Sequence, residues 1–201
     1  MQVTARSTVV ARQRALLGVL ALALMAAVSA GAQERMAPAQ TAPTEAPAIG
    51  DPAPDFTLPS GDSAGVRTTV RLADLKGRVV VIAFYPGDKT TGCTAELSKF
   101  RDDHATLFGS GVVVLPISVD GVESHVGWAG EMHFPFPLLS DTSRVVATQY
   151  GSTLPGKPYD NRTVFVVGRD GRISYRELRF GALSANAYRD LGNAVAEAKS
   201  R

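Results

Sequence analysis

Short apolar runs that are rich in β-branched residues predict the centre of a β-sheet. Residues 78–85 (RVVVIAFY) and 111–119 (GVVVLPISV) are almost continuously apolar, which is typical of strands covered on both faces. A third core strand is predicted at 163–167, and an Asp-Gly turn joins it to an edge strand at 173–178. Shorter elements are expected ahead of these: strands at 55–58 and 70–72 and a turn at 60–65.

Apolar residues at helical spacing separate these strands. Strands that alternate with helices, followed by a hairpin and a last helix, predict an α/β three-layer sandwich with a central mixed sheet. The thioredoxin fold has this layout, so a thioredoxin-like α/β domain is the expected fold class. The predicted helices span residues 94–108, 122–132, 141–150 and 184–199, the last with Ser184 as its N-cap.

The N-terminal segment 1–32 has the features of a secretory signal peptide. Three arginines precede an apolar stretch at 15–27, and Ala30-Gly31-Ala32 fits the small-x-small rule for cleavage. Export to a periplasm or out of the cell is therefore expected. An uncleaved membrane anchor is the alternative, although the apolar stretch is short for a bilayer span.

The composition changes again after the predicted cleavage site. Residues 33–48 are rich in Ala, Pro and Thr and predict a flexible tether, which leaves 49–201 as the folded domain. Net charge carries little information, because three of the 21 basic residues lie in the leader and the other 18 face 19 acidic residues. No nucleic-acid surface is predicted from this balance.

The chain has a single cysteine, Cys93, placed after the predicted strand 78–85 and a polar turn. A helix is predicted to start at it, and the free N–H groups of a helix N-terminus favour the thiolate over the thiol. Exported domains usually pair their cysteines, but a lone cysteine has no intramolecular partner. It is then a buried inert residue, a link between chains or a reactive thiol.

The residues around Cys93 resemble the active-site signature of the peroxiredoxins, which reads Pro86-x-x-x-Thr90-x-x-Cys93 in this chain. The wider stretch 84–102 is similar to the bacterioferritin-comigratory, or PrxQ-like, branch of that family (AhpC/TSA). The resemblance covers about residues 49–198 in the family's order. Further matching segments lie at 50–56, 133–141 and 161–171.

The resemblance implies a thiol-dependent peroxidase without a cofactor and a role for each of five residues. Cys93 would attack one oxygen of the O–O bond, and the Thr90 hydroxyl would hydrogen-bond the thiolate and the peroxide. Arg162 would hold the thiolate and the peroxide oxygen, and Glu96 would orient it through a bidentate pair. Pro86 would limit the access of water.

Four of these residues also have purely structural interpretations. Thr90 could serve only as a helix N-cap, and Glu96 could only favour the helix dipole. Arg162, taken alone, would be a surface residue at the start of a strand. A lone cysteine in a helix is more often a core residue than a nucleophile, and the motif is what favours reactivity.

The chain departs from the family pattern in one chemically important place. Ser98 stands where many relatives of this branch have a resolving cysteine, so the resemblance is to a one-cysteine peroxiredoxin. The sulfenic acid would be reduced by an external thiol: a thioredoxin-like protein, a glutaredoxin-like protein or a small thiol. Gly87 and Thr91 also differ from the family's usual lysine and proline, as adjustments of the loop. A monomer or a homodimer is expected.

Other functions of a thioredoxin-like domain fit the sequence less well. A disulfide exchanger needs Cys-x-x-Cys, and position 96 is Glu. A copper chaperone needs two cysteines and a histidine, and His104, His125 and His133 show no ligand spacing, so no metal is predicted and the histidines are expected to be ordinary surface or core residues. A non-catalytic binding domain and a peroxide sensor that uses the same thiol remain alternatives.

Overall fold

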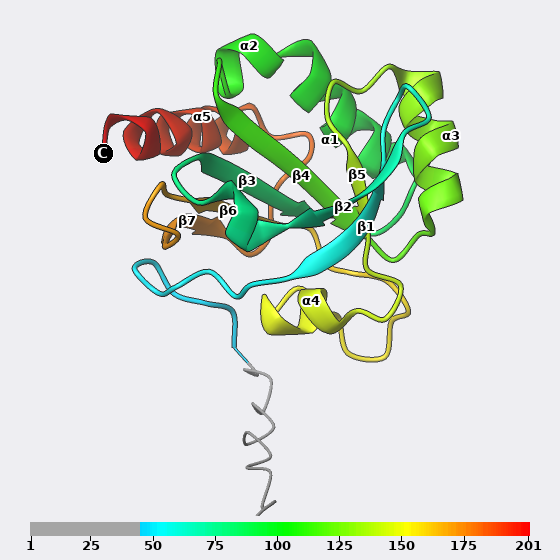
Figure 1. Cartoon of the computed structure of the whole chain (residues 1–201), viewed down its shortest axis with the longest axis horizontal. Coiled ribbons are helices and arrows are strands. Elements are labelled where there is room, and N and C mark those ends of the chain that lie inside the picture. The colour runs from blue at the N-terminus through cyan, green and yellow to red at the C-terminus, as the bar shows by residue number, and fades with distance from the viewer. Residues whose placement is uncertain (1–44) are drawn as a thin grey trace, which may run out of the picture. The chain divides into compact units, whose positions relative to one another are not determined.

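The computed structural model describes residues 45–201, which contain a mixed sheet of seven strands in the order β2-β1-β5-β4-β3-β6-β7 (Figure 1). The predicted signal segment and most of the predicted tether lie outside the described residues. The strands are β1 (Thr57–Gly61), β2 (Arg67–Arg71), β3 (Val79–Phe84), β4 (Val112–Ser118), β5 (Leu138–Ser140), β6 (Thr163–Val167) and β7 (Ile173–Glu177). The helices are the 3-10 helix η1 (Leu72–Leu75) and α1 (Thr91–Asp102), α2 (His104–Leu107), α3 (Val122–Met132), α4 (Val145–Gln149) and α5 (Ala185–Ser200).

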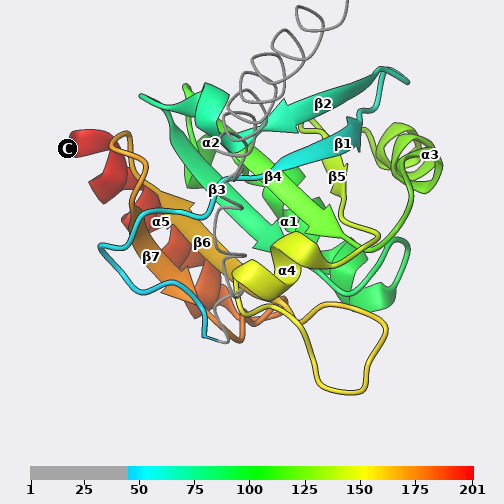
Figure 2. The same cartoon turned by 60° about the horizontal axis from the view of Figure 1, so that its bottom comes forward.

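The sheet is covered on both faces, as the buried strands predicted. Every residue of β3 is buried. Its odd-numbered residues pack with α1, α2, α3 and α5, and its even-numbered residues pack with α4 and with apolar residues of β1 and η1. Figures 1 and 2 show α4 on the opposite side of the sheet from α1 and α5. The three-layer α/β prediction is therefore confirmed.

The centre of the sheet is parallel and its flanks are antiparallel. Strand β4 runs parallel to both β3 and β5, whereas β6 runs antiparallel to β3. The carboxyl ends of β3, β4 and β5 therefore meet at one edge, and the segments that follow them lie together there. The amino end of β6 reaches the same edge, because Thr163 pairs with Phe84 at the end of β3.

The first hairpin differs from its prediction. Ser60 and Gly61, expected in a turn, belong to β1 and pair with Thr68 and Arg67 of β2. The turn is shorter than its composition suggested, because the Asp62 carboxylate accepts the N–H groups of residues 64 and 66 and tightens it. As a result β2 begins earlier than expected, and Leu72 opens η1 instead of ending a strand.

Two predicted helices have different boundaries. The helix expected at 94–108 begins at Thr91 and is broken at Asp103, where the backbone leaves helical angles before α2. The helix expected from Asp141 begins only at Val145, because Arg144 adopts a left-handed conformation at φ 58°. Asp141 still acts at the helix terminus, where its Oδ2 accepts the N–H of Ala147 at 2.8 Å.

Other boundaries agree with the sequence analysis. Helix α3 and strand β6 have the predicted limits, and the hydroxyl of Ser184 caps α5 by accepting from the N–H of Ala187 at 3.4 Å. The chain before β1 also contacts the domain, since the carbonyls of Ala46 and Pro47 accept from Arg176 of β7. Within residues 45–201 no helix is long and apolar enough to cross a bilayer.

Candidate active site

Cys93 lies in the first turn of α1, at the sheet edge where β3 ends. The first hydrogen bond of the helix runs from the N–H of Thr94 to the carbonyl of Thr90 at 2.8 Å. Cys93 therefore belongs to the turn whose N–H groups point out of the helix, although α1 begins at Thr91 and not at the cysteine as expected. The side chain is 0 % exposed and lies within the core cluster that includes Leu97 and Phe100.

Arg162 reaches Cys93 from the amino end of β6. Its Nη2 lies 3.3 Å from the Cys93 sulfur, and its Nη1 forms an ion pair with Oε2 of Glu96. The Arg162 side chain is 16 % exposed and Glu96 is 0 % exposed, so both contacts are shielded from water. A guanidinium beside the sulfur stabilises negative charge there. The structure thus brings together the three residues that the sequence analysis proposed as a unit.

The contact between Arg162 and Glu96 is simpler than the bidentate pair expected. One guanidinium nitrogen binds the carboxylate, because the other is directed at sulfur. Among residues 45–201, Oε1 of Glu96 has no hydrogen-bond partner. Arg162 therefore donates to two different acceptors, the Glu96 carboxylate and the Cys93 sulfur.

The backbone on both sides of Arg162 is held in place. Its N–H donates to the side-chain oxygen of Asn161 at 2.9 Å, and its carbonyl accepts from the N–H of Phe180 at 3.0 Å. Gly92 allows the guanidinium to come close to α1, since a Cβ at that position would lie 3.2 Å from Nη2. The position of the guanidinium thus depends on a small residue in the helix as well as on its own strand.

Thr90 and Pro86 lie in the loop between β3 and α1. Thr90 occupies the N-cap position of α1, but its hydroxyl donates to the carbonyl of Gly87 at 3.2 Å. The N-cap interpretation therefore fits its backbone and not its side chain. In the part of the chain that the structure describes, the hydroxyl makes no hydrogen bond to Cys93. Pro86 is half-buried and follows the buried Tyr85 directly.

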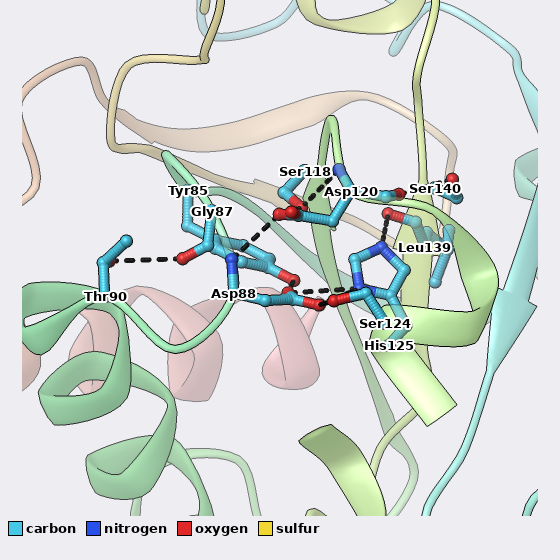
Figure 3. A network of polar contacts seen from close by, with 10 residues as sticks. All are labelled: Tyr85, Gly87, Asp88, Thr90, Ser118, Asp120, Ser124, His125, Leu139 and Ser140. Atoms are coloured by element: carbon cyan, nitrogen blue, oxygen red, sulfur yellow. Dashed lines mark hydrogen bonds and ion pairs between the residues drawn. The ribbon is translucent and has the colours of Figure 1, made fainter. Parts of the chain in front are cut away.

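A second buried polar cluster lies beside the same loop, and Figure 3 shows its members. The Asp88 carboxylate accepts hydrogen bonds from the hydroxyls of Tyr85 and Ser124, each at 2.7 Å. Nδ1 of His125 lies 3.0 and 3.1 Å from its two oxygens. Burial raises the pKa of Asp88, but the hydrogen bond and charge of His125, with the two hydroxyls, outweigh this and lower the pKa below its ordinary value.

The contact between Asp88 and His125 could not be predicted from the sequence. His125 was expected to be an ordinary core or surface residue, and it is buried as one of those alternatives requires. Asp88 lies inside the Pro86–Thr90 motif, and this position could have identified it as a candidate residue of the site. Its partner is 37 residues away, and no spacing rule connects a loop with the first turn of a distant helix.

A third buried carboxylate lies two residues before Arg162. Nε of Arg144 donates to Oδ1 of Asp160 at 3.0 Å, while its terminal nitrogens donate to the carbonyls of Lys157 and Tyr159. Burial raises the pKa of Asp160 to about 6, although Arg144 acts in the opposite direction. Arg144 thereby holds the segment that leads into Arg162.

Possible metal ligands do not gather in the described part of the molecule. Residues 45–201 contain no group of three or more His, Cys, Asp or Glu side chains arranged to hold a metal ion. His104 packs against the ring of Phe108, and His133 ends α3 in a left-handed conformation. The charged donor beside the Cys93 sulfur is the Arg162 guanidinium.

Comparison with known proteins agrees with this arrangement. The model of the AhpC/TSA family matches residues 49–176. A protein of Coxiella burnetii named as a Bcp peroxiredoxin is 42% identical over 132 residues, which cover 63% of this chain and 85% of that protein. Peroxiredoxin Bcp of Bacillus subtilis is 35% identical over 131 residues, 62% of this chain and 81% of its own length. The solved structure of peroxidoxin BcpB from Mycobacterium tuberculosis superimposes with a TM-score of 0.62 at 33% identity, covering 77% of this chain and 97% of that one.

Proposed function

This chain belongs to the AhpC/TSA family and is a peroxiredoxin, a thiol-dependent peroxidase, and on this premise we propose that it reduces hydrogen peroxide and small alkyl hydroperoxides through Cys93. One observation carries the proposal: the Arg162 guanidinium lies 3.3 Å from the sulfur of a buried cysteine in the first turn of a helix. The guanidinium is a charged donor both to the sulfur and to an oxyanion that forms beside it.

In the proposed peroxide step, the Cys93 thiolate attacks one oxygen of the hydroperoxide. The S–O bond forms as the O–O bond breaks, so sulfur loses two electrons and becomes a sulfenic acid. The other oxygen leaves as hydroxide or alkoxide and takes a proton to become water or an alcohol. Arg162 stabilises the sulfur anion first and the oxygens as charge moves onto them.

The remaining three motif residues act on the geometry of this step. The Thr90 hydroxyl leaves the carbonyl of Gly87 and donates to the peroxide instead. This change needs only a rotation of the Thr90 side chain. Glu96 keeps the Arg162 guanidinium oriented toward the sulfur and the peroxide. Pro86 has no N–H to bind water and would limit the access of water to the sulfur. These roles follow the family resemblance and are supported by the shared sheet edge.

The second half of the cycle needs a thiol from outside the chain. Cys93 is the only cysteine and position 98 is serine, so a disulfide within the chain is excluded. An external thiolate attacks the sulfenic sulfur, which releases water and forms a mixed disulfide, and a second thiol then frees Cys93. The reductant is a thioredoxin-like protein, a glutaredoxin-like protein or a small thiol. We also propose that the leader directs this chemistry outside the cytoplasm.

The test is mass spectrometry after brief exposure to low peroxide, with dimedone as the sulfenic acid trap. One dimedone adduct at Cys93 is expected, and Cys93→Ser should show none while it keeps its far-UV circular dichroism. Peroxide consumption with added thiol is measured in parallel. Many turnovers per cysteine are expected, a single oxidation would indicate a sensor, and a thiol that stays unmodified would contradict both.

A further inference from the structure

We propose that Asp88 and His125 form a positioning pair for the peroxide step, holding the loop 86–90 where the Thr90 hydroxyl can turn from the carbonyl of Gly87 to a peroxide at Cys93. The proposal rests on the proposed function and deepens it. Neither side chain makes a hydrogen bond to Cys93 among residues 45–201, so both would act through the loop. The pair joins the loop after β3 to the first turn of α3 (Figure 3).

The Asp88 carboxylate joins the loop to both neighbouring elements. One oxygen accepts from Tyr85 at the end of β3, and the other accepts from Ser124 in α3. With the contact to His125, each carboxylate oxygen has two donors, and the side chain is only 3 % exposed. A buried carboxylate with all its bonding capacity used is firmly held, because any movement of the loop would leave a charge unpaired in the core.

His125 extends the connection to the sheet. Its Nε2 lies 3.1 Å from the carbonyl of Leu139 in β5, while Nδ1 faces Asp88. A carbonyl and a carboxylate are both acceptors, so each ring nitrogen of His125 faces an acceptor. The ring is 0 % exposed and the Asp88 carboxylate 3 % exposed. This pairing ties the active-site loop to the central sheet.

The loop backbone is held from a second side by Asp120, which follows β4. Its Oδ2 accepts the N–H of Asp88 and the hydroxyl of Ser118, each at 2.8 Å. Gly87 fits against the same oxygen, since a Cβ there would lie 3.3 Å from it. The carbonyl of Gly87 is the acceptor for the Thr90 hydroxyl, so fixing residues 87 and 88 fixes the position from which that hydroxyl turns to the peroxide.

One residue of the loop 86–90 has a strained backbone conformation that the Asp88–His125 pair can stabilise. Lys89, between Asp88 and Thr90, has a positive φ of 59°, a conformation that costs energy for a residue with a side chain. Such conformations persist where the surroundings over-determine them, and they gather at functional sites. The ammonium of Lys89 pairs with Glu131 only at the surface, where ion pairs contribute little. The buried pair at Asp88 is therefore the stronger restraint on the strained residue.

The experiment compares two reactions of the same thiol in the Asp88→Asn variant of the mature protein. Oxidation by hydrogen peroxide needs the Thr90 hydroxyl in place, whereas alkylation by iodoacetamide reports only how far the buried Cys93 thiol becomes exposed and ionised. We expect the ratio of the peroxide rate constant to the alkylation rate constant to fall at least tenfold. Equal falls in both rates, or an unchanged ratio, would overturn the proposal, because a residue that only stabilises the fold would affect both reactions alike.

A double-mutant cycle tests whether Asp88 acts through Thr90. Thr90→Val removes the hydroxyl, and Asp88→Asn in that background should cause little further loss of peroxide rate. Additive effects would contradict the connection. If Asp88→Asn does not fold, Ser124→Ala removes one donor to the carboxylate and leaves the ion pair, and a smaller fall in the same ratio is expected there; an unchanged ratio would count against the proposal.

The matched control is Glu123→Gln. Glu123 neighbours Ser124 in the first turn of α3 and forms an exposed ion pair with Arg67, so the variant removes a charge from the same helix without touching the loop. Its rate ratio should equal that of the unmodified protein. A protein that fails to react with peroxide before any substitution would refute the peroxidase proposal itself, and that outcome is distinct from an unchanged ratio in Asp88→Asn.

Discussion

Asp88 lies in the loop 86–90 and Glu96 lies in α1, on either side of Cys93 in the sequence. Both carboxylates are buried, and they differ in how completely their oxygens are hydrogen-bonded. Asp88 has donors at both oxygens, from one ring nitrogen and two hydroxyls. Glu96 is bonded at Oε2 by Arg162, and its Oε1 has no partner among residues 45–201. Both side chains are almost completely buried.

This difference suggests different roles for the two carboxylates. Asp88 holds the loop 86–90 in place, and Glu96 holds the arginine that contacts the reactive sulfur. A fully bonded buried network is rigid, because every alternative arrangement loses hydrogen bonds. A guanidinium divided between Glu96 and the Cys93 sulfur can shift toward a bound peroxide without leaving its carboxylate. We expect the Asp88 side to determine mainly where the loop lies and the Arg162 side to determine mainly how fast sulfur reacts.

The largest effect should come from Arg162→Ala. Removing a donor to developing negative charge costs about 10²- to 10³-fold in rate at comparable sites, and we expect a loss of that size in the peroxide rate constant, measured by stopped-flow. The control is Arg179→Ala, an exposed arginine near the end of β7, whose rate should be unchanged. A loss below about threefold in Arg162→Ala would contradict this difference in roles, since it would show that Arg162 does not control the rate at which the sulfur reacts.

The second effect concerns stability on the Asp88 side. His125→Asn removes the ring that holds a buried carboxylate, and breaking such a buried pair costs about 3–5 kcal/mol, or about 10 °C in Tm for a domain of this size. Thermal unfolding followed by circular dichroism measures it. Glu123→Gln breaks an exposed pair on the same helix and should change Tm by no more than about 2–4 °C. Equal shifts in the two variants would contradict the view that the buried pair is a major support.

The sequence predicts features that depend on short stretches of chain. The strand at 163–167 and the central run at 78–85 could be identified because a strand covered on both faces is apolar at every position. The cysteine motif could be identified because its residues lie within one loop and one helical turn. The break at Asp103 could not, since Phe100 and Leu107 on either side of it face the same core.

Contacts between distant segments of chain needed the structure. Arg162 lies beside Cys93, 69 residues away, because Thr163 pairs with Phe84 in the sheet. That register is a property of the assembled sheet, and without the family resemblance nothing near Arg162 marks it. His125 is a stronger case, since neither its helix pattern nor the resemblance indicated that its ring faces Asp88.

The smallest effect extends the comparison to Asp160, another half-bonded buried carboxylate paired with an arginine. Its Oδ2 has no partner within the described residues, as in Glu96, but no reactive sulfur is near. Burial raises its pKa from 3.8 to about 6, so the folded protein holds this proton more tightly than the unfolded chain does. The stability from this group is therefore complete below about pH 4 and is lost as the pH rises through about 6.

Asp160→Asn should remove that dependence, because the amide stays neutral and its oxygen can still accept from Arg144. We expect the Tm of the variant to match the unmodified protein near pH 4 and to exceed it by a few degrees at pH 7, with the difference opening between pH 4 and 6. Tm measured by circular dichroism across this range checks the shape of the curve. Parallel curves would show that the half-bonded carboxylate costs nothing when charged. The absence of a partner on Glu96 would then no longer distinguish the reactive side from the Asp88 side.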